Sequence, residues 1–368
     1  MNDWQVRRSR PRGDCLDGLI FNRRRLVTDQ LDAGVRNIVV IGTSAGGVQA
    51  LIALFENLPA DLPAAFLVVL HIPAHEPSVL HSILARVTSM RVVAAQEGQR
   101  IEAGTVYVAV ADRHLMVTED GIRLTRGPKE CRVRPAVDVL FRSAAVNYGA
   151  RVIGVILSGA LDDGTAGMWA IKDRGGLTYV QDPGEAMLSS MPDSAIAHVE
   201  IDLVGPTSVL ATALSKAVGT RIADQPTHEV KTRHVIESVI SLKGNGLEAG
   251  VMGLGKVSQF TCPDCHGVLV QIEEGTIVRF RCHTGHAFSM KSLICEVNEA
   301  IDTGLWDTLR AVEERILLLR QMAEQAASVG AANDAAECTR QADLAEKRLA
   351  PLREWVLDPK LFGHDDDK

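Results

Sequence analysis

A lone serine stands among glycines at the point where a short apolar run gives way to an amphipathic pattern. Residues 42–47 read Gly-Thr-Ser-Ala-Gly-Gly, with Ser44 in the middle. The Gly-x-Ser-x-Gly spacing is that of a nucleophile elbow, a tight turn that lifts a serine hydroxyl into solvent. A dinucleotide motif would need a further glycine and a P-loop would need a lysine, and neither is present. The remaining structural alternative for Ser44 is a helix N-cap.

Two other residues could complete a catalytic triad with this serine. A nucleophilic serine needs a histidine base and an acid that orients the base. His71 directly follows the apolar run 66–70, and Asp163 lies in the loop after the run 152–157. Because parallel strands end at one edge of a sheet, we expect the three side chains to meet there. The structural alternatives are a polar strand end for His71 and an N-cap for Asp163.

The turn around Ser44 also offers groups that could stabilise an oxyanion. We expect backbone N–H groups at the start of the following helix, beginning at Ala45, to point toward the reacting carbonyl. Gly46 and Gly47 would let a substrate backbone come close, because neither has a Cβ. A loop N–H near Ala160 could serve as a second donor.

The elements that must position these residues follow from the alternation of apolar runs and amphipathic segments. This alternation predicts an α/β fold, a doubly wound, mostly parallel, Rossmann-like sheet. The predicted strands are 38–42, 66–70, 91–95, 152–157, 177–180 and 201–204. The predicted helices are 47–58, 78–88, 136–148, 165–174 and 206–218. Residues 105–127 predict short antiparallel strands that turn at Asp120-Gly121, as an insertion or edge element.

Residues 38–218 resemble the catalytic domain of the chemotaxis-type (CheB-type) protein-glutamate methylesterases. The matching pieces are IGTSAGG, LHIP, ADRHL at 111–115, RPAVDVLFRSAA at 134–145 and LSGALDDGTAGM at 157–168. The resemblance implies that Ser44 is the nucleophile, His71 the base and Asp163 the acid. The chain departs from the family at Ala45, where threonine is common. It departs again in the loop Gly-Ala-Leu-Asp-Asp-Gly, which in the family often reads Gly-Met-Gly-Asn-Asp-Gly.

The resemblance also implies a reaction and a partner. It implies hydrolysis of γ-glutamyl methyl esters on a chemoreceptor through an acyl-enzyme, with no cofactor for catalysis. Arg134 lies in a matching piece and is a candidate contact to an acidic receptor helix. Only 37 residues precede the first predicted strand, so we expect no N-terminal receiver domain and no control by phosphorylation within the chain. The alternatives are a glutamine deamidase or general esterase with the same triad, and a non-catalytic signalling adaptor.

A second cluster has the spacing of a metal site. Cys262-x₂-Cys265 and Cys282-x₃-His286 flank a predicted hairpin that turns at Glu274-Gly275. This is the arrangement of a zinc ribbon, and four protein ligands make such a zinc structural. His283 is the rival fourth ligand. We prefer His286 because the x₃ spacing lets the chain turn back, and because extended members of the resembled family read Cys-x-x-Gly-His here.

The last part of the chain predicts a helical hairpin with a coiled-coil-like seam. Apolar residues recur at alternating steps of four and three in 305–323 and again in 338–356, on either side of Gly330. Pro351 should kink or interrupt the second helix. We expect the ribbon and this hairpin to bind another protein.

Composition and charge limit the remaining possibilities. The net charge of -7 argues against general nucleic-acid binding, and no apolar run is long enough to insert in a membrane. Seven cysteines, an odd number with three at metal spacing, indicate reduced thiols in a cytoplasm. The predicted division is a flexible leader 1–36, a catalytic domain 37–219, a linker 220–257, a zinc ribbon 258–290, a helical hairpin 291–358 and a tail 359–368.

Overall fold

A seven-stranded sheet forms the centre of the N-terminal body. The computed structural model describes residues 31–76, 78–222 and 230–358, so most of the predicted leader and the tail lie outside it. The strand order is β3-β4-β2-β1-β7-β8-β9, and every neighbouring pair is parallel. The strands are β1 Ile38–Thr43, β2 Ala65–Leu70, β3 Arg91–Ala94, β4 Thr105–Val108, β7 Val152–Ile156, β8 Leu177–Gln181 and β9 Leu203–Gly205. The predicted α/β class is confirmed.

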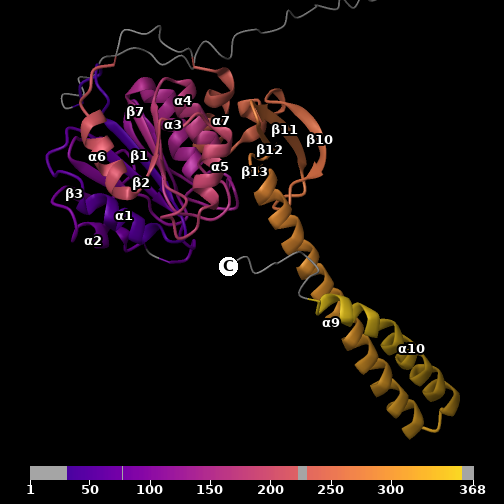
Figure 1. The fold of residues 1–368 in the computed structure, drawn as a ribbon. Helices are drawn as coiled ribbons and strands as arrows, with labels where there is room; N and C mark the ends of the chain where they lie inside the picture. The colour runs from indigo at the N-terminus through magenta and orange to yellow at the C-terminus, as the bar shows by residue number, and fades with distance from the viewer. Residues whose placement is uncertain (1–30, 77, 223–229, 359–368) are drawn as a thin grey trace, which may run out of the picture.

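Helices cover both faces of this sheet (Figure 1). One face packs on α1 Gly47–Glu56, α2 Leu80–Leu84 and α6 Thr207–Ala217. The other packs on α3 Val137–Tyr148, α4 Thr165–Asp173 and α5 Ser190–His198. Strand β1 shows why its sequence is apolar throughout, since Val39 and Ile41 enter one core while Ile38 and Val40 enter the other. Between β7 and α3 lies one turn of 3-10 helix, Gly149–Arg151.

The prediction for residues 105–127 is wrong in its first part. Strand β4 lies inside the parallel sheet, between β3 and β2, and all four of its residues are buried. Only β5 His114–Thr118 and β6 Gly121–Thr125 pair antiparallel, with Thr118 opposite Gly121 across the turn. Residues 109–113 separate β4 from the hairpin, and β4 pairs with β2 and β3 instead.

The segment expected as a linker is largely folded. Residues 223–229 lie outside the described residues, but Thr232–Lys243 form helix α7, which contacts α3 and β6. The short helix α8 Gly246–Ala249 and a 3-10 turn, Val251–Gly253, follow it. The inward face of α7 is partly polar, with Glu237 and Ser241 fully buried. The residues around this helix are polar and contain several glycines, which is why the sequence suggested a linker with room for only a short helix or strand at 235–242.

A second, antiparallel sheet carries the predicted hairpin. It consists of β10 Lys256–Thr261, β11 Val268–Glu274, β12 Ile277–Cys282 and β13 Ala287–Ser289. The chain turns between β11 and β12 at Gly275, whose φ of +59° suits a glycine.

Buried charges join this sheet to α3 and α7. We call them the junction cluster: Glu130, Glu237, Glu274, Arg142, Arg279 and Arg281. Arg142 of α3 donates to both oxygens of Glu130, at 2.8 and 2.7 Å. Arg279 and Arg281 of β12 donate to Glu237 of α7. Each charge is buried and paired, so the sheet is fixed to the body by groups that would be costly to separate.

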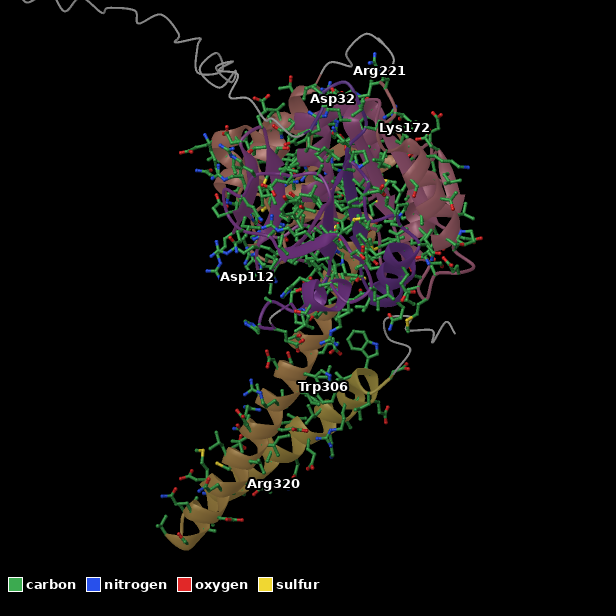
Figure 2. The ribbon with its side chains drawn as sticks, turned by 90° about the vertical axis from the view of Figure 1, so that its left-hand side faces the viewer. Asp32, Asp112, Lys172, Arg221, Trp306 and Arg320 are labelled. Atoms are coloured by element: carbon green, nitrogen blue, oxygen red, sulfur yellow. The ribbon has the colours of Figure 1, made fainter. Side chains whose placement is uncertain are left out.

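Two long helices end the described chain. Helix α9 Met290–Ser328 and helix α10 Ala332–Val356 pack as a hairpin around Leu309, Ile316 and Leu349. The hairpin projects from the body, with Trp306 and Arg320 along it (Figure 2). Pro351 does not interrupt α10. It is exposed, while the apolar seam of the helix continues to Val356. None of the helices in the described ranges is both long and apolar enough to cross a membrane.

Candidate functional site

His71 and Asp163 are hydrogen-bonded at the carboxyl edge of the parallel sheet. His71 Nε2 lies 2.8 Å from Asp163 Oδ2. His71 directly follows β2, and Asp163 lies in the loop after β7; β1 separates these two strands. Asp163 is buried and His71 is partly exposed. The imidazole can therefore reach solvent while the acid behind it cannot.

The N-terminus of α3 holds the Asp163 carboxylate in place. Val137 N donates to Oδ2 at 2.6 Å, and Asp138 N donates to Oδ1 at 3.0 Å. The positive end of a helix stabilises a negative charge at this position. The structural alternative for Asp163, an N-cap of α4, is not what the structure shows, since α4 begins without a side-chain cap.

Ser44 lies between these two residues in strand order. It follows β1, the strand flanked by β2 and β7. Its backbone N–H donates to Ser158 O at 3.0 Å, and the N–H of His71 donates to Thr43 O at 3.1 Å. These bonds fix the three strand ends side by side. Among the described residues Ser44 Oγ has no hydrogen-bond partner, and the side chain is partly exposed.

The orientation of the imidazole determines which nitrogen could act as a base. A carboxylate oxygen only accepts, so Nε2 carries the hydrogen that His71 shares with Asp163. Nδ1 then holds the free lone pair. The roles of the two nitrogens are exchanged relative to the triad in which Nδ1 faces the aspartate.

Backbone donors are available beside Ser44, although not all those expected. Gly47 N donates to Ser44 O at 2.9 Å, so it is already engaged. Within the described part of the chain, the N–H groups of Ala45, Gly46 and Ala160 have no acceptor. Ala45 and Gly46 stand at the start of α1, a helix of ten residues. They are the better candidates for an oxyanion hole.

The glycines of this turn allow other parts of the protein to pack closely against it. They do not leave open space for a substrate. A Cβ on Gly46 would lie 2.5 Å from Met187 Cβ and 2.6 Å from Ser158 Oγ. A Cβ on Gly47 would lie 2.2 Å from Thr43 Oγ1. Gly46 also has a φ of +77°. The space that we expected to admit a substrate backbone is filled by the protein itself.

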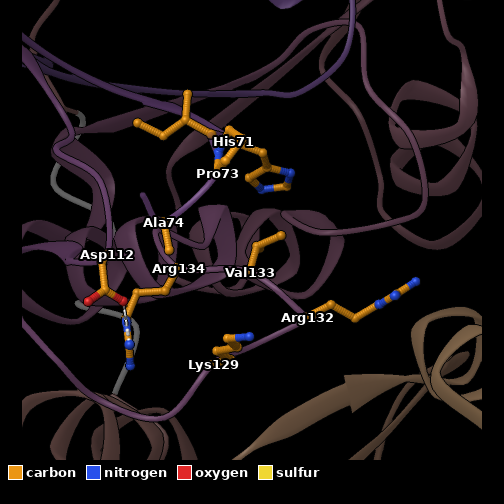
Figure 3. A pocket seen from close by; sticks show the side chains of 9 residues that line it. His71, Pro73, Ala74, Asp112, Lys129, Arg132, Val133 and Arg134 are labelled. Carbon is orange, nitrogen blue, oxygen red and sulfur yellow. Dashed lines mark hydrogen bonds and ion pairs between the residues drawn. The ribbon is translucent and has the colours of Figure 1, made fainter. Parts of the chain in front are cut away.

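A cavity of about 340 Å³ opens beside His71 (Figure 3). Its lining consists of His71, Ile72, Pro73, Ala74, Asp112, Lys129, Arg132, Val133 and Arg134. Arg134, expected to contact substrate, donates from Nε to Asp112 Oδ1 at 2.9 Å and from Nη1 to Gly127 O at 2.8 Å. The guanidinium holds the pKa of Asp112 below its ordinary value. Arg134 therefore holds Asp112 and the backbone at Gly127 together in the wall of the cavity.

Lys129 and Arg132 also line the cavity. The basic run 126–134 predicts cations near the edge of the cleft, although for Lys129 alone a solvated loop was the favoured interpretation. The available signal was the density of cations between 126 and 134, directly before a piece that matches the family.

The four predicted metal ligands come together in the second sheet. One ligand atom from each of Cys262, Cys265, Cys282 and His286 lies within 4.8 Å of all the others. The Sγ atoms of Cys265 and Cys282 are 3.6 Å apart, and His286 Nδ1 is 3.6 Å from Cys282 Sγ. A zinc tetrahedron with Zn–S bonds of about 2.3 Å has edges of about 3.8 Å. The rival ligand His283 instead lies against Gly267.

Comparison with known proteins identifies the family. Residues 39–214 match the family described as CheB methylesterase. A provisionally named protein-glutamate methylesterase/protein-glutamine glutaminase of Leptospira interrogans is 38% identical over 167 residues, which cover 45% of this chain and 86% of that one. The chain belongs to the CheB methylesterase family.

Other relatives carry the same name. Protein-glutamate methylesterase/protein-glutamine glutaminase 2 of Methanosarcina acetivorans is 40% identical over 195 residues, 51% of this chain and 55% of that one. The chain thus spans about half the length of this curated relative. The crystal structure of the Thermotoga maritima CheB methylesterase catalytic domain matches with a TM-score of 0.48 and 34% identity, over 50% of this chain and 98% of that chain.

Proposed function

We propose that this chain is a serine hydrolase that removes methyl groups from γ-glutamyl methyl esters on chemoreceptor-like signalling proteins. The observation that carries the proposal is the His71–Asp163 hydrogen bond on the strand ends that flank Ser44. The names of the relatives support the ester of a protein glutamate as substrate. The free thiols of the described cysteines suit a reducing cytoplasm.

The proposed reaction assigns a role to each of these groups. Ser44 Oγ attacks the ester carbonyl while His71 Nδ1 accepts its proton. Asp163 stabilises the imidazolium that forms. The tetrahedral oxyanion is bound by backbone N–H groups at the start of α1. Methanol leaves with the proton from His71, and the acyl-enzyme is then hydrolysed by a water that His71 deprotonates. Protein groups alone supply each step.

Deamidation of glutamine is a second candidate for the same residues. The relatives' names include protein-glutamine glutaminase. Attack of Ser44 on a carboxamide would release ammonia in place of methanol and give the same acyl-enzyme. The two activities are separated by measuring which leaving group appears.

The cysteine-histidine cluster supports a structural zinc ion. We assign it Cys262, Cys265, Cys282 and His286 as ligands, a set that leaves no open position for a substrate. Such an ion would cross-link the turn between β10 and β11 to the turn between β12 and β13. The proposed role of this sheet and the helical hairpin is to bind a protein partner.

The decisive experiment measures methanol released from methylated receptor fragments by the full chain. We expect release by the wild type and none by Ser44→Ala. Ser208→Ala, which changes an exposed serine far along the chain on α6, is the matched control and should behave as wild type. Release by Ser44→Ala at the wild-type rate would refute the mechanism.

A further inference from the structure

The cavity beside His71 contains more positive charge than its own acidic residue can neutralise. Arg134 is paired with Asp112. Lys129 is exposed and has no ion pair among the described residues. Arg132, the third cation, pairs with carboxylates that do not belong to the cavity lining. Two cations in the cavity lining are therefore not matched by an anion of that lining.

The carboxylates that pair with Arg132 belong to α9. Its guanidinium donates from Nε to Glu296 and from Nη2 to Glu299. These glutamates are three residues apart and so lie on one face of the helix. An acidic helical surface of the chain itself is thus already seated on a cation beside His71. This contact demonstrates what kind of surface Arg132 can bind.

The loop that carries these cations is held in a fixed shape. Cys131 and Arg132 have φ angles of +48° and +74°, which non-glycine residues rarely adopt. Strand β13 supports them: Cys131 N donates to Ala287 O at 2.8 Å, and Ala287 N donates to Lys129 O at 3.1 Å. Local strain of this kind persists only where the surroundings impose it. The backbone that carries the two cations is therefore fixed.

We propose that Lys129 and Arg132 form an anion subsite for a carboxylate side chain that flanks the reacting ester on an acidic helical substrate. Glu296 and Glu299 compete with the substrate for Arg132. This inference rests on the proposed function for the ester beside Ser44. The apolar part of the lining, Ile72, Pro73 and Val133, lowers the local dielectric and strengthens such a charge-assisted contact.

Binding of paired peptides tests the subsite. Both are helical and carry one glutamate methyl ester; they differ only in having glutamates or glutamines one turn to either side of it. Affinities are measured with the full chain carrying Ser44→Ala, so that no turnover occurs. We expect the glutamate peptide to bind about tenfold more tightly. Added Lys129→Gln should bring the two affinities close together, and added Glu296→Gln with Glu299→Gln should widen the difference.

Two controls make the same charge changes elsewhere. Arg113→Gln removes an exposed cation that does not line the cavity, and Glu314→Gln removes a carboxylate from the outer part of α9. Neither should alter the ratio of affinities. Equal affinity for the two peptides, or an unchanged ratio in Lys129→Gln, overturns the subsite. Failure of the wild type to release methanol from either peptide refutes the ester hydrolysis alone, since the binding ratio does not depend on turnover.

Discussion

Ser289 Oγ donates a hydrogen bond to Asp162 Oδ1 at 2.6 Å, and Asp162 immediately precedes the acid that holds His71. Ser289 is also the N-cap of α9, in a capping box with Ser292. Burial raises the pKa of Asp162, and the bond from Ser289 opposes that shift. The start of the long C-terminal hairpin is thus bonded to the loop that carries the proposed catalytic acid.

Replacing this cap should affect both stability and turnover. Ser289→Ala removes the N-cap and leaves Asp162 without its donor, so the free energy of unfolding should fall by about 1–2 kcal/mol. We also expect a severalfold lower kcat, because the loop carrying Asp163 loses a support. Urea unfolding and ester kinetics measure the two effects. Ser328→Ala, at the other end of α9, should leave kcat unchanged; an equal loss there would show that the contact with Asp162 has no catalytic consequence.

The base and the acid should differ in the size of their effects. His71→Ala should lower kcat by about a thousandfold or more, and Asp163→Asn by somewhat less. Asp163→Asn should in addition lower the free energy of unfolding, because the carboxylate accepts from two N–H groups at the start of α3. Steady-state kinetics and denaturant unfolding provide the comparison. A fully active Asp163→Asn would exclude an orienting role.

A methyl group at Gly46 should disrupt the turn that carries Ser44. Gly46→Ala must both keep a φ of +77° and displace Met187, so we expect a loss of stability of about 2–3 kcal/mol with little remaining activity. Gly98→Ala measures the cost of the positive φ alone. Gly98 has a φ of +71°, and nothing lies within 4 Å of the added Cβ. Equal destabilisation by the two variants would show that Met187 moves aside freely.

The junction cluster predicts a loss of stability in acid. Burial raises the pKa of Glu130, but Arg142 and Arg281 outweigh it and bring the pKa to about 2. When the pKa of a carboxyl is lower in the folded state than in the unfolded state, the group stabilises the protein at pH values above its ordinary pKa, which is 4.5 here. That stability is lost as the pH falls from 4.5 to about 2.

The size of this effect is on the order of 3 kcal/mol. Urea midpoints measured against pH should therefore fall steeply below pH 4.5. In Glu130→Gln the curve should be flatter in this window and lower at neutral pH, because the arginines lose a buried partner. Glu102→Gln, at a surface ion pair, is the control and should keep the wild-type slope. An unchanged slope in Glu130→Gln would contradict the assignment.

One zinc ion should be present for each chain. Cys282→Ser should lose it, whereas Cys295→Ser, which changes a partly buried cysteine of α9 outside the cluster, should retain it. Elemental analysis gives the metal content. Because a structural metal contributes folding energy, the first protease cuts after chelation should fall within 256–289. Full-length protein free of zinc and equally resistant to protease would rule out the site.

The sequence located the parallel sheet and the edge on which His71 and Asp163 meet. It could do so because His71 directly follows one apolar run and Asp163 lies in the loop after another, and parallel strands all end on the same side. It placed α7 inside a linker, because no local pattern shows that the buried Glu237 accepts from Arg279, which is 42 residues away. It likewise could not show that Asp112 accepts from Arg134, because the two residues are 22 positions apart. Long-range charge pairing left no periodic signal.

The length of α9 has a mechanical consequence. Its 39 residues span about 58 Å at a rise of 1.5 Å per residue. If the helix pivots at Ser289, Glu296 lies only about 10 Å along this arm. A tilt of about 5° then moves the outer end by about 5 Å but Glu296 by about 1 Å. The hairpin is a lever with a long outer arm, so a weak sideways force at its tip acts on the Arg132 ion pairs as a force about six times larger.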